Sequence, residues 1–181
     1  MNNRIRHNEI RKDSNDNELL VYKTLKKLNI DYHYVEYTKE EKDDLVFIDN
    51  LIEVKGIKNL LFKTRNLKKD LFLIILPRDK RFDTKSFRNR YNITKIELVN
   101  DEELLEFLNS KEGEVSIVDL LFDKDSKVKL YIDEDILKEE YFRFHPCNGL
   151  VTVRIKTSDL IDKLIPYLNH ELVILEDLWK S

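Results

Sequence analysis

Short strand-like segments separated by polar turns constrain the fold of this chain more than any other feature. LLFKTR (60–65) and LFLIIL (71–76) flank the polar turn NLKK (66–69), a pattern typical of a β-hairpin. No apolar run approaches the roughly 18 residues that a membrane-spanning helix needs. The apolar segments are therefore expected to build a globular core, and no membrane partner is expected.

Several other segments have the composition and alternation of strands. They are DYHYVEY (31–37), EVSIVDLLF (114–122), KVKLYID (127–133), LVTVRI (150–155) and ELVILED (171–177). The second and third of these flank the polar turn DKDS, which predicts a second hairpin. The apolar segment LVFIDNLIEV (45–54) fits more than one state, and its pattern leaves the choice open.

Amphipathic helices interrupt these strands at irregular intervals. The first follows Ser14, with Ser14 or Asp16 as its N-cap, and the second is DEELLEFLNS (101–110). The third begins at Ser158 and is expected to kink or tighten at Pro166. This irregular alternation favours an α+β fold with a mixed sheet over a regular βαβ repeat.

A length of 181 residues suits one domain, or one domain with an arm. Residues 1–14 are polar and lack apolar periodicity, so they are predicted to form an arm before a domain at 15–181. They also lack the apolar region of a signal peptide. The single cysteine rules out an internal disulfide, and the cytoplasm is the expected compartment. The four histidines lie far apart, so no metal site is expected.

Positive charge is concentrated in one segment although the net charge is −3. Residues 55–95 contain 13 lysines and arginines against three acidic residues, whereas residues 96–181 contain 10 against 20. Such a segment can form a patch that neutralises phosphates. The alternative is that these cations cluster by chance on solvated faces, with the acidic remainder folded against them.

Glycine is rare, with three residues where average usage gives about 13 in a chain of this length. Each stands in a loop beside a predicted strand: VKGIKNL, KEGEVS and PCNGLV. Glycine is needed where φ is positive or where a group comes close to the backbone. The three loops are therefore candidates for one shared site, although each also fits an ordinary turn.

Four collinear segments resemble the YbaK/ProX-type aminoacyl-tRNA editing domains. KNLLF (58–62) with LFLIILP, Asp83 and Lys85 resembles the family order KNLFL, LVVLP and D-x-K. GEVSIVDLLFD (113–123) resembles GxVSPFGL, and FHPCNGLVTV (144–153) is similar to HPxxNTATV. The terminal D-L and G-H-E pattern is matched by Ser158-Asp159-Leu160 and Asn169-His170-Glu171. The likeness covers roughly residues 18–178 and is greatest to free-standing prolyl-tRNA editing proteins.

The resemblance implies a fold, an activity and partners. The fold is a single α+β domain with a mixed, curved sheet and flanking helices. The activity is trans-acting hydrolysis of the ester that joins a wrongly attached small amino acid, typically alanine, to tRNA(Pro). The expected partner is the acceptor end of the aminoacylated tRNA, and prolyl-tRNA synthetase is a second candidate. No cofactor is implied.

The resemblance also implies the site residues. An activated ester needs a placed water, stabilisation of the oxyanion and firm positioning of the CCA end. Lys58 is the first candidate for catalysis, and the backbone N–H groups of Gly113 and Gly149 are candidates for an oxyanion hole. The expected substrate-binding residues are Asn59, Ser116, Ile117, His145, Asn148 and Thr152, and the expected tRNA-binding residues are Lys55, Lys63, Arg65, Lys68 and Lys69. Cys147 is not expected to be the nucleophile, because a reactive thiolate needs a nearby base or positive charge.

The chain departs from the family pattern at pocket positions. Ile117, Val118 and Asp119 replace Pro, Phe and Gly, and Gly149 replaces asparagine, although Asn148 lies one position earlier. These changes leave two alternatives open. The enzyme could prefer serine or cysteine as the attached amino acid, or the protein could have lost catalysis and act as a module that binds the tRNA end. An acidic-cluster nuclease has no support, because the carboxylates fall in runs typical of solvated helix faces.

Overall fold

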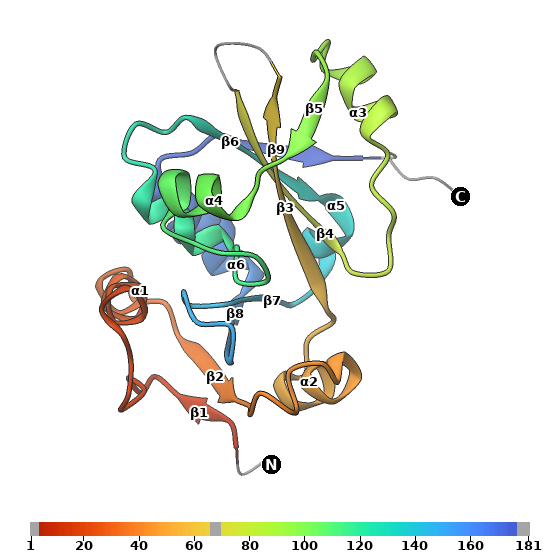
Figure 1. Ribbon diagram of the computed structural model, residues 1–181. Helices are drawn as coiled ribbons and strands as arrows, with labels where there is room; N and C mark the ends of the chain where they lie inside the picture. Colours follow the sequence, from red (N-terminus) through yellow and green to blue (C-terminus); the bar gives the residue numbers. More distant parts are fainter. Residues whose placement is uncertain (1–3, 66–69, 177–181) are drawn as a thin grey trace.

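Two β-sheets form the framework of the protein in a computed structural model that describes residues 4–65 and 70–176 (Figure 1). The first sheet is antiparallel, with the order β1 (Arg6–His7), β2 (Tyr32–Glu36), β8 (Val151–Lys156) and β7 (Tyr141–Phe144). The second has the order β5 (Ile96–Leu98), β3 (Ile57–Thr64), β4 (Leu71–Pro77), β6 (Val128–Asp133) and β9 (Leu172–Leu175). It is mixed, because β4, β6 and β9 are parallel while β3 is antiparallel to both neighbours. The predicted α+β fold with a mixed sheet is confirmed.

The predicted hairpin is formed by β3 and β4. Leu60 lies opposite Ile74 and Leu61 opposite Leu73, so both strands contribute side chains to each face of the sheet. The predicted turn at 66–69 lies outside the described residues. Since β4 is central in its sheet and covered on both faces, its apolar run is buried without alternation.

Helices cover the sheets and connect their strands. They are α1 (Asp16–Lys27), α2 (Leu45–Ile52), α3 (Thr84–Arg90), α4 (Asp101–Leu108), α5 (Glu134–Lys138), and a C-terminal helix made of α6 (Thr157–Asp159), the π-helical η2 (Leu160–Leu164) and α7 (Ile165–Leu168). The segment at 45–54, which the pattern left open, is α2. Within the described residues, every helix is too short or too polar to span a bilayer.

Two predicted helix details differ from the structure. Asn15 caps α1, because its side chain accepts a hydrogen bond from the Glu18 N–H; the cap is neither Ser14 nor Asp16. The C-terminal helix widens into η2 before Pro166 instead of tightening there. Proline has no N–H to donate to the preceding turn, and a π-helical turn is one way to accommodate that loss.

The second predicted hairpin is wrong. Its first strand is instead a 3-10 helix, η1 (Ile117–Phe122), and the Asp119 carboxylate accepts the Ser116 N–H at 2.8 Å to cap its start. A short apolar run cannot be assigned to strand or buried helix by periodicity alone. Strands β5 and β7 were not expected; both are short, and β7 follows the charged segment DEDILKEE.

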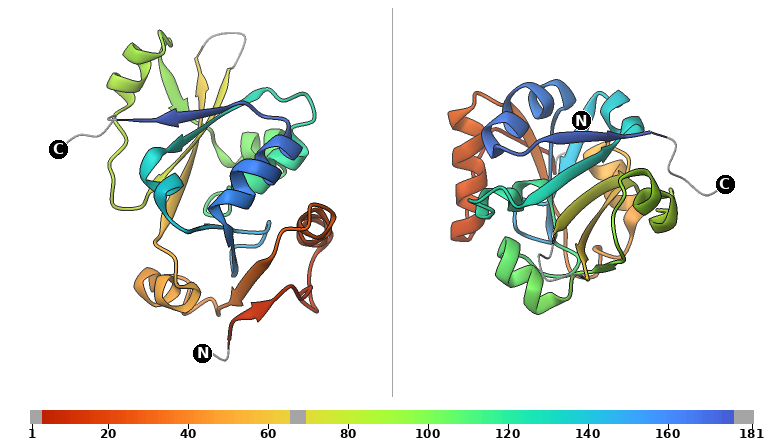
Figure 2. Two further views of the ribbon diagram at one scale, coloured as in Figure 1. Left: turned by 180° about the vertical axis from the view of Figure 1, so that it is seen from behind. Right: turned by 90° about the horizontal axis from the view of Figure 1, so that it is seen from above.

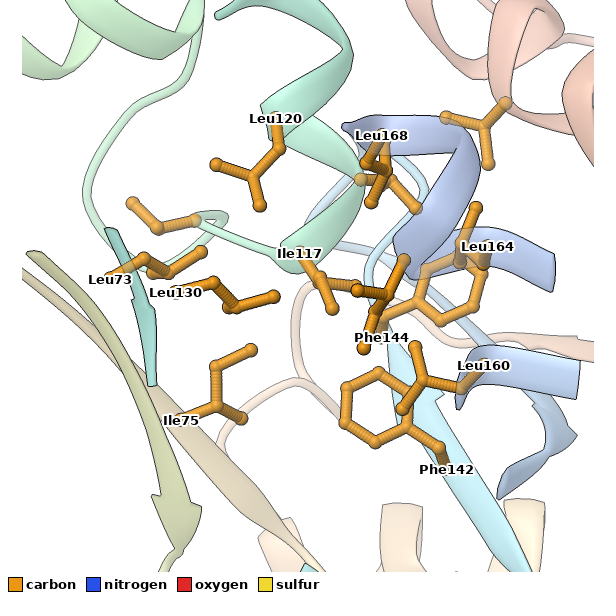
Figure 3. Packing of buried hydrophobic residues seen from close by; sticks show 14 of the residues in the cluster. Leu73, Ile75, Ile117, Leu120, Leu130, Phe142, Phe144, Leu160, Leu164 and Leu168 are labelled. Atoms are coloured by element: carbon orange, nitrogen blue, oxygen red, sulfur yellow. The ribbon is translucent and has the colours of Figure 1, made fainter. Parts of the chain in front are cut away.

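The main hydrophobic core lies between the mixed sheet, η1, β7 and the C-terminal helix. Figure 3 shows Ile117 pointing between Leu130 on one side and Phe144 and Leu164 on the other. A second, aromatic cluster covers the opposite face of the sheet beneath α3, where Phe87 packs edge-on against Phe72. As Figures 1 and 2 show, α3 and β5 lie at one end of the molecule and β1 and α2 at the other.

The described part of the predicted N-terminal arm contacts the domain. Strand β1 pairs with β2, and the Arg11 guanidinium makes two hydrogen bonds of 2.8 Å to the fully buried Glu18 carboxylate. The same carboxylate accepts hydrogen bonds from the Tyr22 hydroxyl and the Asn148 amide. Residues 6–11 are thus tied to α1 and, through Glu18, to the loop after β7.

Candidate functional site

A cavity of about 720 Å³ lies where β3 begins, and several of the predicted site residues line it. Its walls include Lys58, Asn59, Gly113, Val115 and His145. These residues come from β3, from the loop before η1 and from the loop after β7. The structure therefore brings together three segments that are far apart in the sequence.

Lys58 and Asn59 leave β3 on opposite faces of the sheet. Lys58 lies opposite Leu76, which belongs to the aromatic cluster under α3, whereas Asn59 lies opposite Ile75 of the main core. Residues directly opposite in a ladder point to the same face. The Lys58 amine donates a hydrogen bond to the main-chain carbonyl oxygen of Arg78 at 3.0 Å. It has to leave this carbonyl to reach a ligand beside His145.

Asn59 presents a buried acceptor without a partner. Its Oδ1 atom is shielded from solvent and has no hydrogen-bond partner among the described residues. A buried polar atom left unpaired costs about 1–3 kcal/mol. Asn59 also lines the cavity, so a small movement of its side chain would bring this oxygen within reach of a donor on a bound ligand.

His145 is held in one tautomer. Its Nδ1 lies 2.8 Å from the Val151 carbonyl oxygen, and since a carbonyl only accepts, Nδ1 carries the proton and Nε2 is left as an acceptor. Burial lowers the pKa of His145, and the positive charges of Arg143 and Lys42 act in the same direction. The imidazole that lines the cavity is therefore neutral at pH 7.

The two candidate oxyanion-hole glycines differ in their surroundings. Gly113 has a φ of +77° and lines the cavity; the nearest atom to a Cβ placed there is the Lys42 Nζ, 4.0 Å away. The Gly149 N–H instead donates to the Glu114 carboxylate at 3.1 Å. An oxyanion role for Gly149 would require Glu114 to move away, and it stays a prediction.

The remaining predicted substrate-binding residues do not line the cavity. Ser116 is fully buried, and its hydroxyl accepts the His145 main-chain N–H at 3.2 Å. Ile117 is buried in the main core. The Thr152 hydroxyl is 3.1 Å from the Tyr37 hydroxyl, and the Asn148 amide donates to Glu18. Each therefore has an internal partner, and direct substrate contact stays a prediction for all four.

Cys147 has the surroundings of an inert thiol. Burial raises its pKa, and so does the Asp119 carboxylate, which accepts the thiol hydrogen at 3.4 Å. The thiolate is thus disfavoured, in agreement with the expectation that Cys147 is not a nucleophile. Among the described residues, no three His, Cys, Asp or Glu side chains gather in a way that could hold a metal ion.

Three of the predicted tRNA-binding cations form ion pairs with glutamates. The ion pairs are Lys55 with Glu139 at 2.5 Å, Lys63 with Glu103 at 2.6 Å and Arg65 with Glu97 at 2.6 Å. The predicted contacts Lys68 and Lys69 lie outside the described residues. These pairs match the alternative in which the acidic parts of the chain fold against the basic segment.

Lys42 is a cation near the cavity that sequence reasoning missed. It is exposed, and its amine approaches Gly113 closely enough for its charge to act on His145. No residue in the described parts of the chain forms an ion pair with it. It lies in the mixed-charge segment TKEEKDD, outside the basic region, so composition gave no signal for it.

Comparisons with known proteins agree with this architecture. Residues 50–163 match the family model described as aminoacyl-tRNA editing domain. The chain is 25% identical to the prolyl-tRNA editing protein ProX of Acetoanaerobium sticklandii, over 80% of this chain and 88% of that protein. It is also 25% identical to prolyl-tRNA synthetase associated domain-containing protein 1 of Danio rerio, over 83% of this chain and 82% of that protein.

A solved structure extends the likeness to the fold. It is the crystal structure of a candidate trans-editing enzyme for prolyl tRNA synthetase, with a TM-score of 0.67 and 14% identity over 91% of this chain and 99% of that one. At this identity the likeness shows the shared fold alone. The sequence match at 50–163 includes Asn59, Gly113 and His145 but not Lys42.

Proposed function

Because the chain belongs to the aminoacyl-tRNA editing domain family, we propose that it is a trans-acting deacylase. It would hydrolyse the ester of a mischarged small amino acid, with alanine as the expected case, on tRNA(Pro). The observation that carries this proposal is one cavity lined both by Asn59, whose buried oxygen is unpaired, and by the neutral His145 ring. The relatives named for prolyl-tRNA editing support tRNA(Pro) as the substrate.

The cavity supplies what hydrolysis of an activated ester needs. His145 Nε2 accepts a hydrogen bond from the water that attacks the ester carbonyl carbon. Asn59 Oδ1 accepts one from a donor of the aminoacyl-adenosine end. The Gly113 N–H, in an open left-handed turn, is the candidate donor to the developing oxyanion. The ester C–O bond then breaks, the ribose oxygen takes up the proton that the attacking water gives up and leaves as a hydroxyl, and the free amino acid is released.

Cations would guide the charged end of the tRNA into this cavity. Lys42 is placed to contact a phosphate at the Gly113 side, since no described carboxylate neutralises it. Lys58 contributes if its amine leaves the Arg78 carbonyl and binds the substrate instead. The substrate offers the amine a charged partner, whereas the carbonyl is neutral. The prior hydrogen bond keeps the amine positioned until then.

The cavity wall favours a small apolar side chain. Leu61, Leu104 and Val115 line it beside the polar groups, and a methyl group fits such a surface without leaving a hydroxyl unpaired. An apolar pocket distinguishes substrates by only about 1–3 kcal/mol per methylene. Preference for alanine over serine and cysteine is therefore expected to be moderate, while proline is excluded by shape.

A module that binds the tRNA end without catalysis is the second candidate. Two observations favour it: the Lys58 amine is bound to Arg78, and the Gly149 N–H is bound to Glu114. If both contacts persist when tRNA binds, neither group reaches the ester.

A deacylation assay with Ala-, Ser-, Cys- and Pro-tRNA(Pro) separates the two candidates. The deacylase proposal predicts turnover of Ala-tRNA(Pro) well above spontaneous hydrolysis and little turnover of Pro-tRNA(Pro). Binding of the same tRNAs without turnover would establish the module instead. Absence of both binding and turnover would reject both candidates.

A further inference from the structure

We infer that Asp119 is a positioning residue that holds His145 at the cavity, acting through its contacts with Ser116 and Cys147. This inference rests on the proposed function. Asp119 is 1% exposed and does not line the cavity itself. It stands at a position where the family pattern has glycine, so its role belongs to this chain's own sequence.

One carboxylate oxygen controls the main chain of His145 through Ser116. Asp119 Oδ2 accepts the Ser116 N–H at 2.8 Å, and the Ser116 hydroxyl accepts the His145 N–H at 3.2 Å. Ser116 is fully buried, so both bonds are shielded from competing water. The position of the imidazole's backbone therefore depends on the Asp119 carboxylate.

The other carboxylate oxygen holds the loop just beyond His145. Asp119 Oδ1 accepts the Cys147 thiol hydrogen at 3.4 Å. Cys147 has a φ of 58°, which is uncommon for a residue other than glycine and costs on the order of 1–3 kcal/mol. Such a conformation persists only when its surroundings hold it, and the contact with Asp119 is one of those constraints. His145 is thus fixed between two segments that both bind the same carboxylate.

Asp119 changes its charge near neutral pH. Burial raises the pKa of Asp119 to about 7, and the charge of Glu114 acts in the same direction. Hydrogen bonds from the Ser110 side chain, the Ser116 N–H and the Cys147 thiol act in the opposite direction.

All three of these partners donate, so the ionised carboxylate matches them and a protonated one must give up or reverse a contact. The neutral His145 ring and the Cys147 thiol are the titratable side chains of the loop after β7. The hold on His145 is therefore expected to strengthen as Asp119 ionises.

The test compares Asp119→Asn and Asp119→Ala with the matched control Asp133→Asn. Asp133 is also fully buried and has a pKa raised by burial, but it binds Lys80 and caps α5. In the wild type, kcat for Ala-tRNA(Pro) should rise through an inflection near pH 7. Asp119→Asn should lose this inflection and lower kcat roughly 10- to 100-fold with little change in KM. Asp133→Asn should keep the inflection.

A second measurement does not depend on turnover. In an NMR titration, the wild-type His145 ring should titrate below about 6.5, the ordinary value for histidine. In Asp119→Ala and Asp119→Asn the titration should move toward that ordinary value, because a released ring gains contact with water. In Asp133→Asn it should not move.

The outcomes separate the inference from the proposed function. If the wild type does not deacylate but His145 shifts in the Asp119 variants, the proposed function fails and the structural inference stands. If the wild type deacylates and Asp119→Asn keeps both its pH profile and its His145 titration, the inference is overturned. If the alanine variant does not fold, the asparagine variant decides, because it keeps the shape of the side chain.

Discussion

The Lys58 amine donates a hydrogen bond to the main-chain carbonyl oxygen of Arg78 across 3.0 Å. This contact places the first catalytic candidate at the edge of the cavity, with its charge turned to the protein's own backbone. Arg78 is itself fixed, since its guanidinium pairs with Asp49 and packs over Gly56, where a Cβ would collide with it. Whether the substrate displaces this carbonyl determines whether Lys58 takes part in catalysis.

Replacing Lys58 tests its catalytic role. We expect Lys58→Ala to lower kcat/KM for Ala-tRNA(Pro) roughly 100- to 1,000-fold, the usual effect of removing a group that stabilises a developing charge. The midpoint of urea unfolding should change little, because water can replace the amine at the Arg78 carbonyl.

The matched control for Lys58 is Lys23→Ala, which removes an exposed lysine from α1. It should leave both turnover and stability unchanged. Equal activities of the Lys58 and Lys23 variants would remove Lys58 from the mechanism and leave Asn59 and His145 as the central groups.

Asn59 and Asn100 line the same cavity and are expected to respond in opposite ways. Asn59→Ala removes an unpaired buried oxygen, so the free energy of unfolding should be nearly unchanged or slightly higher. Binding of an alanyl-adenosine analogue that cannot be hydrolysed should weaken roughly 10-fold or more, as measured by calorimetry.

Asn100→Ala is the contrasting variant. Asn100 caps α4 in a capping box with Glu103, so its loss should lower the free energy of unfolding by about 1 kcal/mol. Analogue binding should change less than in Asn59→Ala. If Asn59→Ala destabilises the protein and binds the analogue normally, the Asn59 oxygen does not serve a ligand.

Local pattern predicted much of the fold. The β3–β4 hairpin, α1, α4 and the strands β2, β6, β8 and β9 follow from alternation, turn residues and apolar runs. Helix η1 could not be predicted in the same way, because a short buried apolar run fits either a strand or a helix and its packing decides between them. The Asp119 cap on the Ser116 N–H is itself a local contact, three residues apart. Strand β7 is equally dependent on context, since its edge is defined by pairing with β8.

The site was predicted in part, for identifiable reasons. The resemblance grouped Asn59, Gly113 and His145 in one predicted site, and all three line the same cavity. Pattern alone could not show that Lys58 and Asn59 leave the strand on opposite faces, because that depends on the cross-strand register. Nor could it show that glutamates from distant segments pair with Lys55, Lys63 and Arg65, or that Lys42 approaches Gly113.

Asp119 should also make the free energy of unfolding depend on pH. The folded protein keeps its proton up to about pH 7, whereas the unfolded chain releases it near the ordinary value of 3.8. The resulting stabilisation is fully present below the unfolded value and is lost as pH rises to about 7. Urea unfolding across this range should show wild-type stability falling relative to Asp119→Asn. Parallel curves for the two proteins would contradict a raised pKa for Asp119.

Lys42 should contribute to binding through a phosphate contact. We expect Lys42→Ala to weaken binding of a tRNA(Pro) acceptor-stem minihelix and to reduce the slope of log K against log salt by about 0.7–0.9. Lys39→Ala, in the same connecting segment, serves as the charge-matched control and should have a smaller effect. A slope that falls in Lys63→Ala but not in Lys42→Ala would place the tRNA on the basic segment instead.

Single-turnover hydrolysis of Ala-tRNA(Pro) by the wild type and by Asn59→Ala tests the central claim most directly, because Asn59 belongs to the cavity and not to the supporting core. If the cavity is the site of deacylation, the wild type should release alanine rapidly. The variant should release it at a rate at least about 10-fold lower, with both proteins equally folded. Equal rates of alanine release from the two proteins would contradict it.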